Sequence, residues 1–330
     1  MKKLAGFYLI LTLILLIPIQ SFALTKLAQT GLKFLDVCVG ARPAAMGEAY
    51  TMVGNDVNAI FHNPAGIAQM KAEKIDLSFC KINWIANTSI DAFGMLANFG
   101  SWGNFGFSLI TPDYGGIIGT RVSGTELGYI ETGLLDVGGF SAGLAYGRRL
   151  TDKFMIGAVV KYCSENLGEN LFALTSAQDS TWIEKNKVST VAYDLGTIFY
   201  PGFKSFRLGM YIRNFSGAVK YKESDFQLPL TFKMGVAMDI LDFFGEHPDN
   251  SFVVDIDAVH PRDYTERLHV GGEFWYKNML ALRGGYKFNY DEEGITLGVG
   301  INAGGIKLDY AYSEFGVFDN VNRISLGISF

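Results

Sequence analysis

The chain has 330 residues, of which 49% are hydrophobic and 18% are charged, and its formal net charge at pH 7 is −5. It contains no basic cluster, which argues against a nucleic-acid partner. It also contains no internal apolar run long enough to cross a membrane as a helix. Because the apolar residues are dispersed through a chain rich in Gly, Phe and Tyr, the composition favours a membrane β-barrel, with a soluble β-sandwich as the alternative.

The N-terminus has the features of a secretory signal peptide. Lys2 and Lys3 precede an apolar run at residues 9–19, and residues 21–23 (Ser-Phe-Ala) place small side chains at the −3 and −1 positions of a cleavage site. We therefore expect residues 1–23 to be removed after Ala23. No cysteine lies near this cut, so we do not expect a lipoprotein.

The segment that follows, residues 24–73, lacks strand-like alternation and contains Ala-rich patches and several glycines. These features predict short helical turns and loops that pack tightly. We expect this segment to fill the lumen of the barrel as a plug, and residues 74–330 to form the barrel itself.

From Lys74 onward, apolar and polar residues alternate with the period of two that indicates half-buried strands. In the last strand, Ile324 and Ile328 lie on an apolar face, and Arg323 and Ser325 lie on the opposite face. We expect about fourteen strands of roughly ten residues, the length that a tilted strand needs to cross a bilayer. The predicted strands are 75–84, 89–98, 104–112, 137–149, 153–164, 189–200, 204–215, 229–240, 251–260, 266–276, 279–288, 294–302, 305–315 and 322–330.

The connections between these strands alternate in length. Those after even-numbered strands are mostly tight turns, whereas 113–136, 165–188 and 216–228 are long and polar. This arrangement is typical of outer-membrane barrels, whose short turns face the periplasm. The terminal residue, Phe330, lies on the lipid-facing side of the last strand and resembles an assembly signal of such barrels. The expected fold class is thus all-β, a 14-stranded antiparallel transmembrane β-barrel with an N-terminal plug, in a bacterial outer membrane.

Residues 40–70 read GARPAAMGEAYTMVGNDVNAIFHNPAGIAQM. This stretch resembles the N-terminal signature of the PorV/PorQ family, which belongs to the wider FadL-like group of outer-membrane barrels. Residues 144–162 also look like the central hairpin of that family. The motif residues are Gly40, Arg42, Met46, Gly47, Asp56, Phe61, His62, Asn63, Pro64, Ala65 and Gly66. The resemblance implies that the Asn-Pro-Ala stretch belongs to a plug inside a fourteen-stranded barrel.

The chemistry of the motif suits a crowded lumen. Pro64 fixes φ and lacks an N–H donor, and the Asn63 side chain can cap neighbouring backbone. Gly66 permits a close approach of the backbone to the wall. We expect His62 to be a packed side chain, with contact to a ligand in the lumen as the alternative.

Other motifs give no catalytic, metal or cofactor site. Residues 139–143 match G-x-S-x-G, but an alternating strand runs through Ser141, where a nucleophile elbow needs a strand, a turn and a helix. Asp255 and Asp257 share a strand face, where they either bind a cation or line a polar lumen. The cysteine spacings fit no metal motif, although a Cys38–Cys80 disulfide is possible. We expect a protein that is not an enzyme and that needs no cofactor.

Two functions remain open. The PorV/PorQ resemblance implies an accessory protein of type IX secretion, which binds secreted proteins and other secretion components through its extracellular loops. The alternative is a FadL-like plugged channel for hydrophobic small molecules. An apolar pocket that reaches from the loops to the plug would indicate transport, and an exposed apolar patch on the loops would indicate secretion. The recognition candidates, within the long connection 165–188, are Leu171, Phe172, Leu174 and Trp182.

Overall fold

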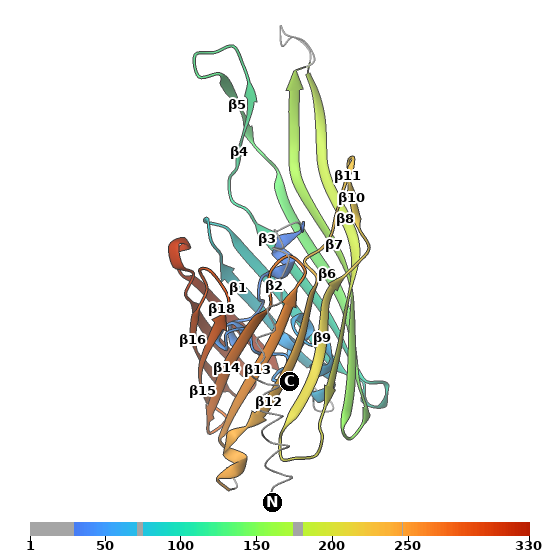
Figure 1. The fold of residues 1–330 in the computed structure, drawn as a ribbon, viewed down its shortest axis with the longest axis vertical. Helices are drawn as coiled ribbons and strands as arrows, with labels where there is room; N and C mark the ends of the chain where they lie inside the picture. Colours follow the sequence, from blue (N-terminus) through green and yellow to red (C-terminus); the bar gives the residue numbers. More distant parts are fainter. Residues whose placement is uncertain (1–29, 71–74, 174–180, 246) are drawn as a thin grey trace, which may run out of the picture.

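Fourteen strands close into an antiparallel barrel in the computed structural model, which describes residues 30–70, 75–173, 181–245 and 247–330 (Figure 1). Each strand pairs with the next one in the barrel, and the first strand closes the ring against the last. The barrel strands are β1 (Ile75–Asn83), β2 (Ser89–Asn98), β3 (Asn104–Asp113), β6 (Val137–Thr151), β7 (Phe154–Ala173), β8 (Thr181–Phe199), β9 (Arg207–Phe215), β12 (Thr231–Asp239), β13 (Ser251–Pro261), β14 (Arg267–Tyr276), β15 (Leu280–Phe288), β16 (Ile295–Ala303), β17 (Ile306–Ser313) and β18 (Val321–Ser329). The predicted 14-stranded antiparallel barrel is confirmed.

Two small hairpins lie in the long connections. β4 (Ile118–Val122) pairs with β5 (Tyr129–Leu134) between β3 and β6, and β10 (Val219–Tyr221) pairs with β11 (Ser224–Phe226) between β9 and β12. Short 3-10 helices occupy three further connections: η4 (Gly100–Trp102), η5 (Ile240–Phe243) and η6 (Gly316–Phe318).

The expectation that 165–188 is a loop is wrong. β7 continues to Ala173 and β8 begins at Thr181, and the two strands stay paired across a bulge near Gly168. The apolar alternation ends earlier because the outer parts of β7 and β8 lie beyond the part of the hairpin that faces lipid. The strands nevertheless continue, because the hydrogen bonds between their backbones do not require apolar side chains. The β4–β5 hairpin and the β7–β8 ends extend well beyond the rest of the barrel (Figure 1).

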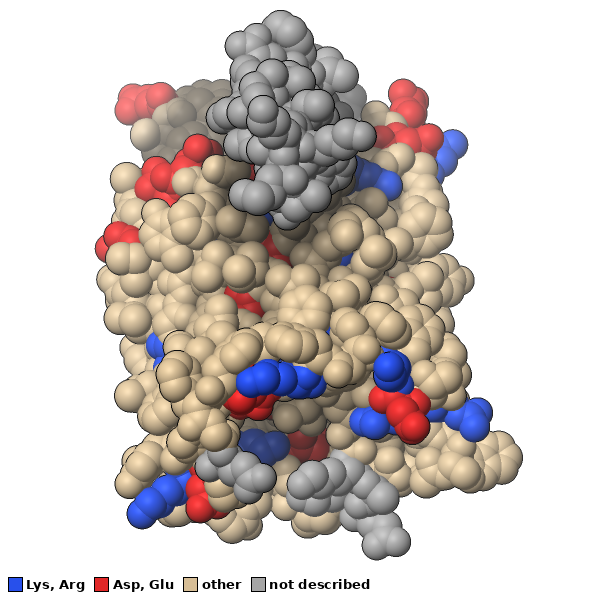
Figure 2. Space-filling model, turned by 60° about the horizontal axis from the view of Figure 1, so that its bottom comes forward, with Lys and Arg blue, Asp and Glu red and all other residues tan. Residues whose placement is uncertain are grey.

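The outer face of the barrel is apolar. On β18, Ile324, Leu326 and Ile328 are exposed, whereas Arg323 and Ser325 are buried in the interior. The side drawn in Figure 2 is largely uncharged, and its Lys, Arg, Asp and Glu residues gather toward the two ends. So large an apolar surface is costly in water and suits contact with lipid. No helix in the described ranges is long and apolar enough to cross a membrane.

Residues 30–70, here called the N-terminal segment, lie inside the barrel and are almost entirely buried (Figure 1). The segment contains the 3-10 helices η1 (Lys33–Asp36), η2 (Val57–Phe61) and η3 (Pro64–Gln69) and the short helix α2 (Ala41–Ala45). α2 packs against β15 to β18, η2 against β1 to β3, and η3 against β6 to β8. The segment therefore touches most of the circumference of the wall.

Glycines on the inner face of the wall make room for this segment. A Cβ at Gly157 would lie 2.2 Å from the carbonyl carbon of Pro64, and a Cβ at Gly285 would lie 2.2 Å from the nitrogen of Gly47. At both places two backbones are in contact, which no larger residue permits. The set, here called the wall glycines, is Gly94, Gly106, Gly147, Gly157, Gly196, Gly209, Gly235, Gly271, Gly285 and Gly298.

Candidate functional site

A cavity of about 810 Å³ lies between the N-terminal segment and the barrel end that carries the long connections. We call it the upper cavity. Its apolar lining includes Leu32, Phe34, Trp84, Ile85, Ile90, Pro112, Ile117, Leu135, Val137, Leu167 and Phe315. Its polar lining includes Glu48, Arg213, Lys233, Arg267, His269, Lys287, Tyr290 and Glu293. The space thus has an apolar and a polar side.

The apolar side is built from the N-terminal segment and from strand ends. Leu32 adopts a left-handed conformation (φ 52°) before η1, and Phe34 is buried within η1. Trp84, just after β1, packs edge-on against Phe315, just after β17, with ring centroids 5.1 Å apart. Residues remote in sequence therefore form one apolar surface above the segment.

This surface reaches a break in the wall. The ladder between β3 and β6 ends at Ile110 and Ser141, although β3 stays paired with β2 as far as Asp113 and β6 is paired with β7 from Val137. Pro112 has no N–H to extend the ladder. Both Pro112 and Val137 line the upper cavity, so the cavity extends to a stretch of wall where two adjacent strands are not hydrogen-bonded.

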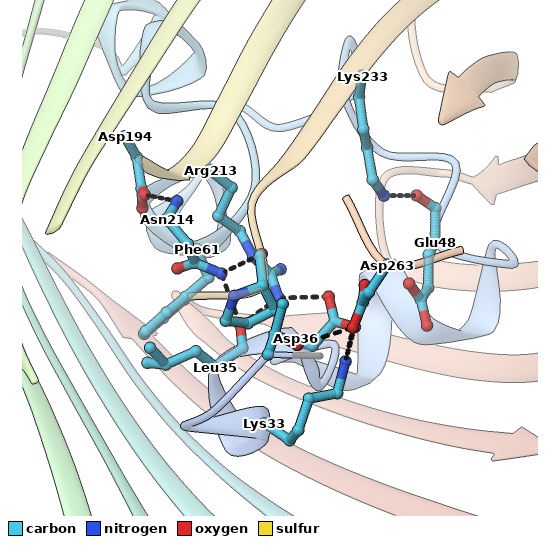
Figure 3. Close-up of polar contacts among 12 residues, drawn as sticks. Lys33, Leu35, Asp36, Glu48, Phe61, Asp194, Arg213, Asn214, Lys233 and Asp263 are labelled. Carbon is cyan, nitrogen blue, oxygen red and sulfur yellow. Dashed lines mark hydrogen bonds and ion pairs between the residues drawn. The ribbon is translucent and has the colours of Figure 1, made fainter. Parts of the chain in front are cut away.

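On the polar side, wall residues hold η1 in place (Figure 3). Lys33 lies with its Nζ 3.0 Å from Asp263 Oδ2 and 3.3 Å from Asp36 Oδ2. Arg213 on β9 donates to the carbonyl oxygen of Leu35 and lies 3.7 Å from the Asp36 carboxylate. The end of η1 is thus clamped between β9 and the connection after β13.

Glu48 joins two further wall cations. Its carboxylate lies 2.8 Å from Lys287 Nζ, and its carbonyl oxygen accepts a hydrogen bond of 3.3 Å from Lys233 Nζ. Lys287 also pairs with Glu293. Burial alone would raise the pKa of Glu48, but the Lys287 ammonium outweighs it and holds the pKa well below its usual range. The cavity wall here consists of mutually neutralised charges.

A second, polar cavity of about 450 Å³ lies on the opposite side of the segment, toward the short turns. We call it the lower cavity. Arg42 of α2 lines it and makes a two-point contact with Glu273 on β14, at 2.7 and 2.6 Å, and a third bond of 2.8 Å to Asp56. Arg283 on β15 bonds to Glu273 and to Asp309, each at 2.7 Å. Burial opposes ionisation of Asp56, but the Arg42 charge prevails and lowers the pKa of Asp56 to about 2.

The structure brings the motif residues together inside the segment. Asn63 caps η3, because its Oδ1 accepts from the Ala65 N–H at 3.1 Å and its Nδ2 donates to the carbonyls of Thr51 (2.9 Å) and Thr197 (3.2 Å). The Nε2 of His62 donates to the Val39 carbonyl at 2.9 Å. None of the motif residues lines the upper cavity, and Arg42 and Asp56 are the ones that line the lower cavity.

Most of the other predicted residues belong to the barrel wall. Leu171, Phe172 and Trp182 belong to paired strands, with Phe172 opposite Trp182, while Leu174 falls outside the described residues. Phe330 pairs with Ile75 through hydrogen bonds of 3.0 and 2.8 Å.

The remaining candidates give no catalytic or metal site. Cys38 and Cys80 are both free thiols. Ser141 lies within β6, in contact with Cys163 rather than with a histidine. No group of three or more His, Cys, Asp or Glu side chains in the described ranges is placed to hold a metal ion.

The sequence pattern did not single out Lys233 and Lys287 in the polar lining of the upper cavity. Lys233 and Lys287 are charged residues whose alternation with outward apolar neighbours places them on the inner face of β12 and β15. This alternation is enough to predict that both lysines face the lumen. Their pairing with Glu48 could not be read from it, because Glu48 lies in an irregular segment.

No protein-family profile matches the chain, and no curated protein matches it. Solved structures resemble it. The toluene transporter TodX of Pseudomonas putida superposes with a TM-score of 0.56 at 17% identity, over 88% of this chain and 97% of that one. The toluene transporter TbuX of Ralstonia pickettii gives 0.56 at 15% identity, with the same coverage. A FadL homologue of Pseudomonas aeruginosa gives 0.52 at 13% identity, over 93% and 99%.

At these identities the likeness shows the fold, and it agrees with the FadL-like group that the N-terminal motif implied; nothing in it points to PorV/PorQ specifically. A closed antiparallel barrel with an apolar outer band is the form in which proteins span outer membranes. The chain therefore has the fold of the FadL-like barrels and lies in the outer membrane.

Proposed function

We propose that the protein is an outer-membrane channel that takes up hydrophobic small molecules through the upper cavity. The observation that carries this proposal is the cavity itself, which has an apolar side and reaches from the long connections to the N-terminal segment. Its volume of about 810 Å³ lies within the range of about 300–1,000 Å³ found for small-molecule pockets. The fold, shared with proteins described as toluene transporters, supports the same class of cargo.

A hydrophobic molecule gains about 25 cal/mol for each Å² of apolar surface that it removes from water. The apolar side of the upper cavity offers that gain beside the break between β3 and β6 and beneath the barrel mouth. Below the cavity, the N-terminal segment lies inside the barrel against most of its wall. Onward passage through the lumen therefore requires this segment to change its conformation.

The test introduces a charge into the apolar lining. Val137→Asp places a carboxylate in the upper cavity, and we expect it to weaken binding of a hydrophobic fluorescent probe by about tenfold or more, because burying the charge is costly. Val317→Asp, at an exposed position in η6, is the matched control and keeps wild-type binding. Equal binding by both variants and by wild type, measured by titration in detergent and by uptake into proteoliposomes, would contradict the proposal.

A type IX secretion role, as PorV/PorQ proteins have, is the second candidate. One observation favours it: the projecting β4–β5 hairpin exposes Val122, Leu127 and Leu134 at 74–83% of their surface. Replacing residues 118–134 with a short Gly-Ser linker separates the two functions. Loss of bound secreted proteins with probe uptake retained supports the secretion role, and the opposite result supports the channel.

A further inference from the structure

The upper and lower cavities approach each other across one short turn. Glu48 lines the upper cavity and Val53 lines the lower one. Between them, Ala49, Tyr50 and Met52 are 0% exposed, and Thr51 is 3% exposed. Residues 49–52, here called the partition turn, therefore form the barrier between the two spaces in this sector of the barrel.

Two carboxylates of the wall hold the partition turn. Asp257 Oδ2 accepts hydrogen bonds from the backbone N–H of Tyr50 (3.1 Å), from the N–H of Thr51 (3.1 Å) and from Thr51 Oγ1 (2.5 Å). Asp255 Oδ2 accepts from the N–H of Met52 at 3.1 Å. The two aspartates are two positions apart on β13, so both point into the lumen, and both are 0% exposed.

These two aspartates lack the cation that the other buried carboxylates have. Among the described residues, each of the others lies within 2.6–3.5 Å of a Lys or Arg nitrogen: Asp56, Asp76, Asp194, Asp263, Glu273 and Asp309. No such ion pair reaches Asp255 or Asp257, and the Oδ1 atom of each has no hydrogen-bond partner. Two adjacent buried carboxyl groups with orphaned oxygens are costly.

This arrangement, here called the latch, can hold the partition turn in place and also release it, because both states satisfy the two carboxyl groups. The amides of the partition turn offset part of the cost of burying the two carboxyl groups. The carboxyl groups in turn accept from the backbone N–H groups of Tyr50, Thr51 and Met52. If the turn withdraws, water enters from the polar lower cavity and hydrates both carboxylates. The closed and open states therefore each have a compensating interaction, which keeps the free-energy difference between them small.

We propose that the partition turn is the gate of the channel and that Asp255 and Asp257 are the positioning residues that hold it shut. The proposal rests on the proposed function, because it assigns the step by which cargo leaves the upper cavity. It requires movement of this turn only, while the rest of the N-terminal segment stays packed against the wall.

Conductance in planar bilayers tests the latch. In the double variant Asp255→Asn with Asp257→Asn we expect the fraction of time spent conducting to rise at least about tenfold, because hydrogen bonds to charged acceptors are lost. Thr51→Val, which removes only the hydroxyl bond, should give a smaller rise.

Asp194→Asn is the control: this wall carboxylate is also buried and bonds to Lys161 and Asn214, both outside the partition turn. Heat-modifiable migration on gels verifies that each barrel is closed. Wild-type conductance in the folded double variant, or an equal rise in Asp194→Asn, overturns the proposal.

A cross-link tests whether the turn moves alone. The Cγ2 atom of Val57 lies 2.7 Å from a Cβ placed at Gly94, so Val57→Cys with Gly94→Cys can form a disulfide that pins the segment to β2. The native Cys38, Cys80 and Cys163 are replaced by Ala in this background. With the pin oxidised, the double Asn variant should keep its raised conductance. A return to wild-type conductance means that the whole segment must leave, and the gate is not the partition turn.

The two proposals fail separately. Absence of saturable probe uptake by the wild-type protein refutes the channel for hydrophobic molecules, and the conductance measurements still decide on the latch. Unchanged conductance in the folded double variant refutes the latch, even where Val137→Asp has shown that the upper cavity binds the probe.

Discussion

His62 is a neutral side chain in a closed space. Its Nε2 donates to the Val39 carbonyl, and its ring stands edge-on against Tyr50 with centroids 5.3 Å apart. Burial disfavours the imidazolium, and the positive charge of Lys233 adds to this effect, so that the pKa of His62 falls to about 3. Burial therefore keeps this ring neutral.

This shift gives the N-terminal segment a pH dependence with a definite sign. The unfolded histidine has a pKa of about 6.5, so between pH 6.5 and 3 the unfolded segment binds a proton that the folded one does not. Stability therefore falls as the pH drops through this window, by about 2 kcal/mol at pH 5. His62→Gln, which retains a donor for the Val39 carbonyl, should abolish most of that slope.

Hydrogen exchange of the backbone amides in residues 57–66, followed from pH 7 to pH 5, measures the effect of His62. Rates are corrected for their intrinsic pH dependence, and the amides of β18 serve as the internal control because the barrel wall should not respond. An identical loss of protection in wild type and His62→Gln would show that another group carries the pH dependence.

The wall glycines decide how closely the N-terminal segment packs against the barrel. η3 rests on Gly147, Gly157 and Gly196, which occupy neighbouring strands and pair with one another in register. The contact leaves no space for a methyl group: a Cβ would meet the Pro64 backbone at Gly157, the Ile67 side chain at Gly147 and the Asn63 side chain at Gly196. The fit of η3 against the wall therefore depends on glycines from three neighbouring strands, β6, β7 and β8.

We expect Gly157→Val to displace residues 63–66 from the wall and to cost about 1–3 kcal/mol, the range typical of overpacking. Gly284→Val on β15 is the matched control, since the nearest atom to a Cβ there is 3.8 Å away. Limited proteolysis of the inserted protein reports the displacement as new cleavage near residue 63. Cleavage that is equal in the two variants would mean that the wall, rather than the contact with η3, was damaged.

The strands could be predicted from sequence because each residue of a lipid-facing strand is apolar where it faces lipid and polar where it faces the lumen. The alternation in β18, for example, places Ile324 and Arg323 on opposite faces without reference to any other strand. The outer part of the β7–β8 hairpin was predicted as a loop because that signal stops where lipid stops. The upper cavity could not be predicted from sequence for a different reason. It depends on contacts between residues distant in sequence, such as Trp84 with Phe315 and Lys287 with Glu48, which no local pattern contains.

Closure of the barrel depends on the seam between β1 and β18. The two strands pair from Asp76 and Ser329 to Asn83 and Asn322, and Phe330 extends the seam with two hydrogen bonds to Ile75. The Phe330 ring itself is exposed, so its removal takes no packing from the barrel interior.

The exposed ring allows the assembly signal to be separated from the seam. Phe330→Ala keeps both backbone bonds to Ile75, whereas deletion of Phe330 removes them as well. If the ring is an assembly signal, both changes reduce the amount of heat-modifiable barrel in the outer membrane. Normal assembly of Phe330→Ala with poor assembly of the deletion would assign the effect to the seam alone.

The contact between the wall glycines and the N-terminal segment has a consequence for biogenesis. The segment packs against the wall in several sectors, with backbone contacts at Gly157, Gly271 and Gly285 and side-chain contacts at the other wall glycines, so a closed barrel leaves little room for it to enter. The segment precedes β1 in the chain, and the β1–β18 seam joins the two ends of the sheet. We therefore expect the strands to assemble around the segment and the β1–β18 seam to form last.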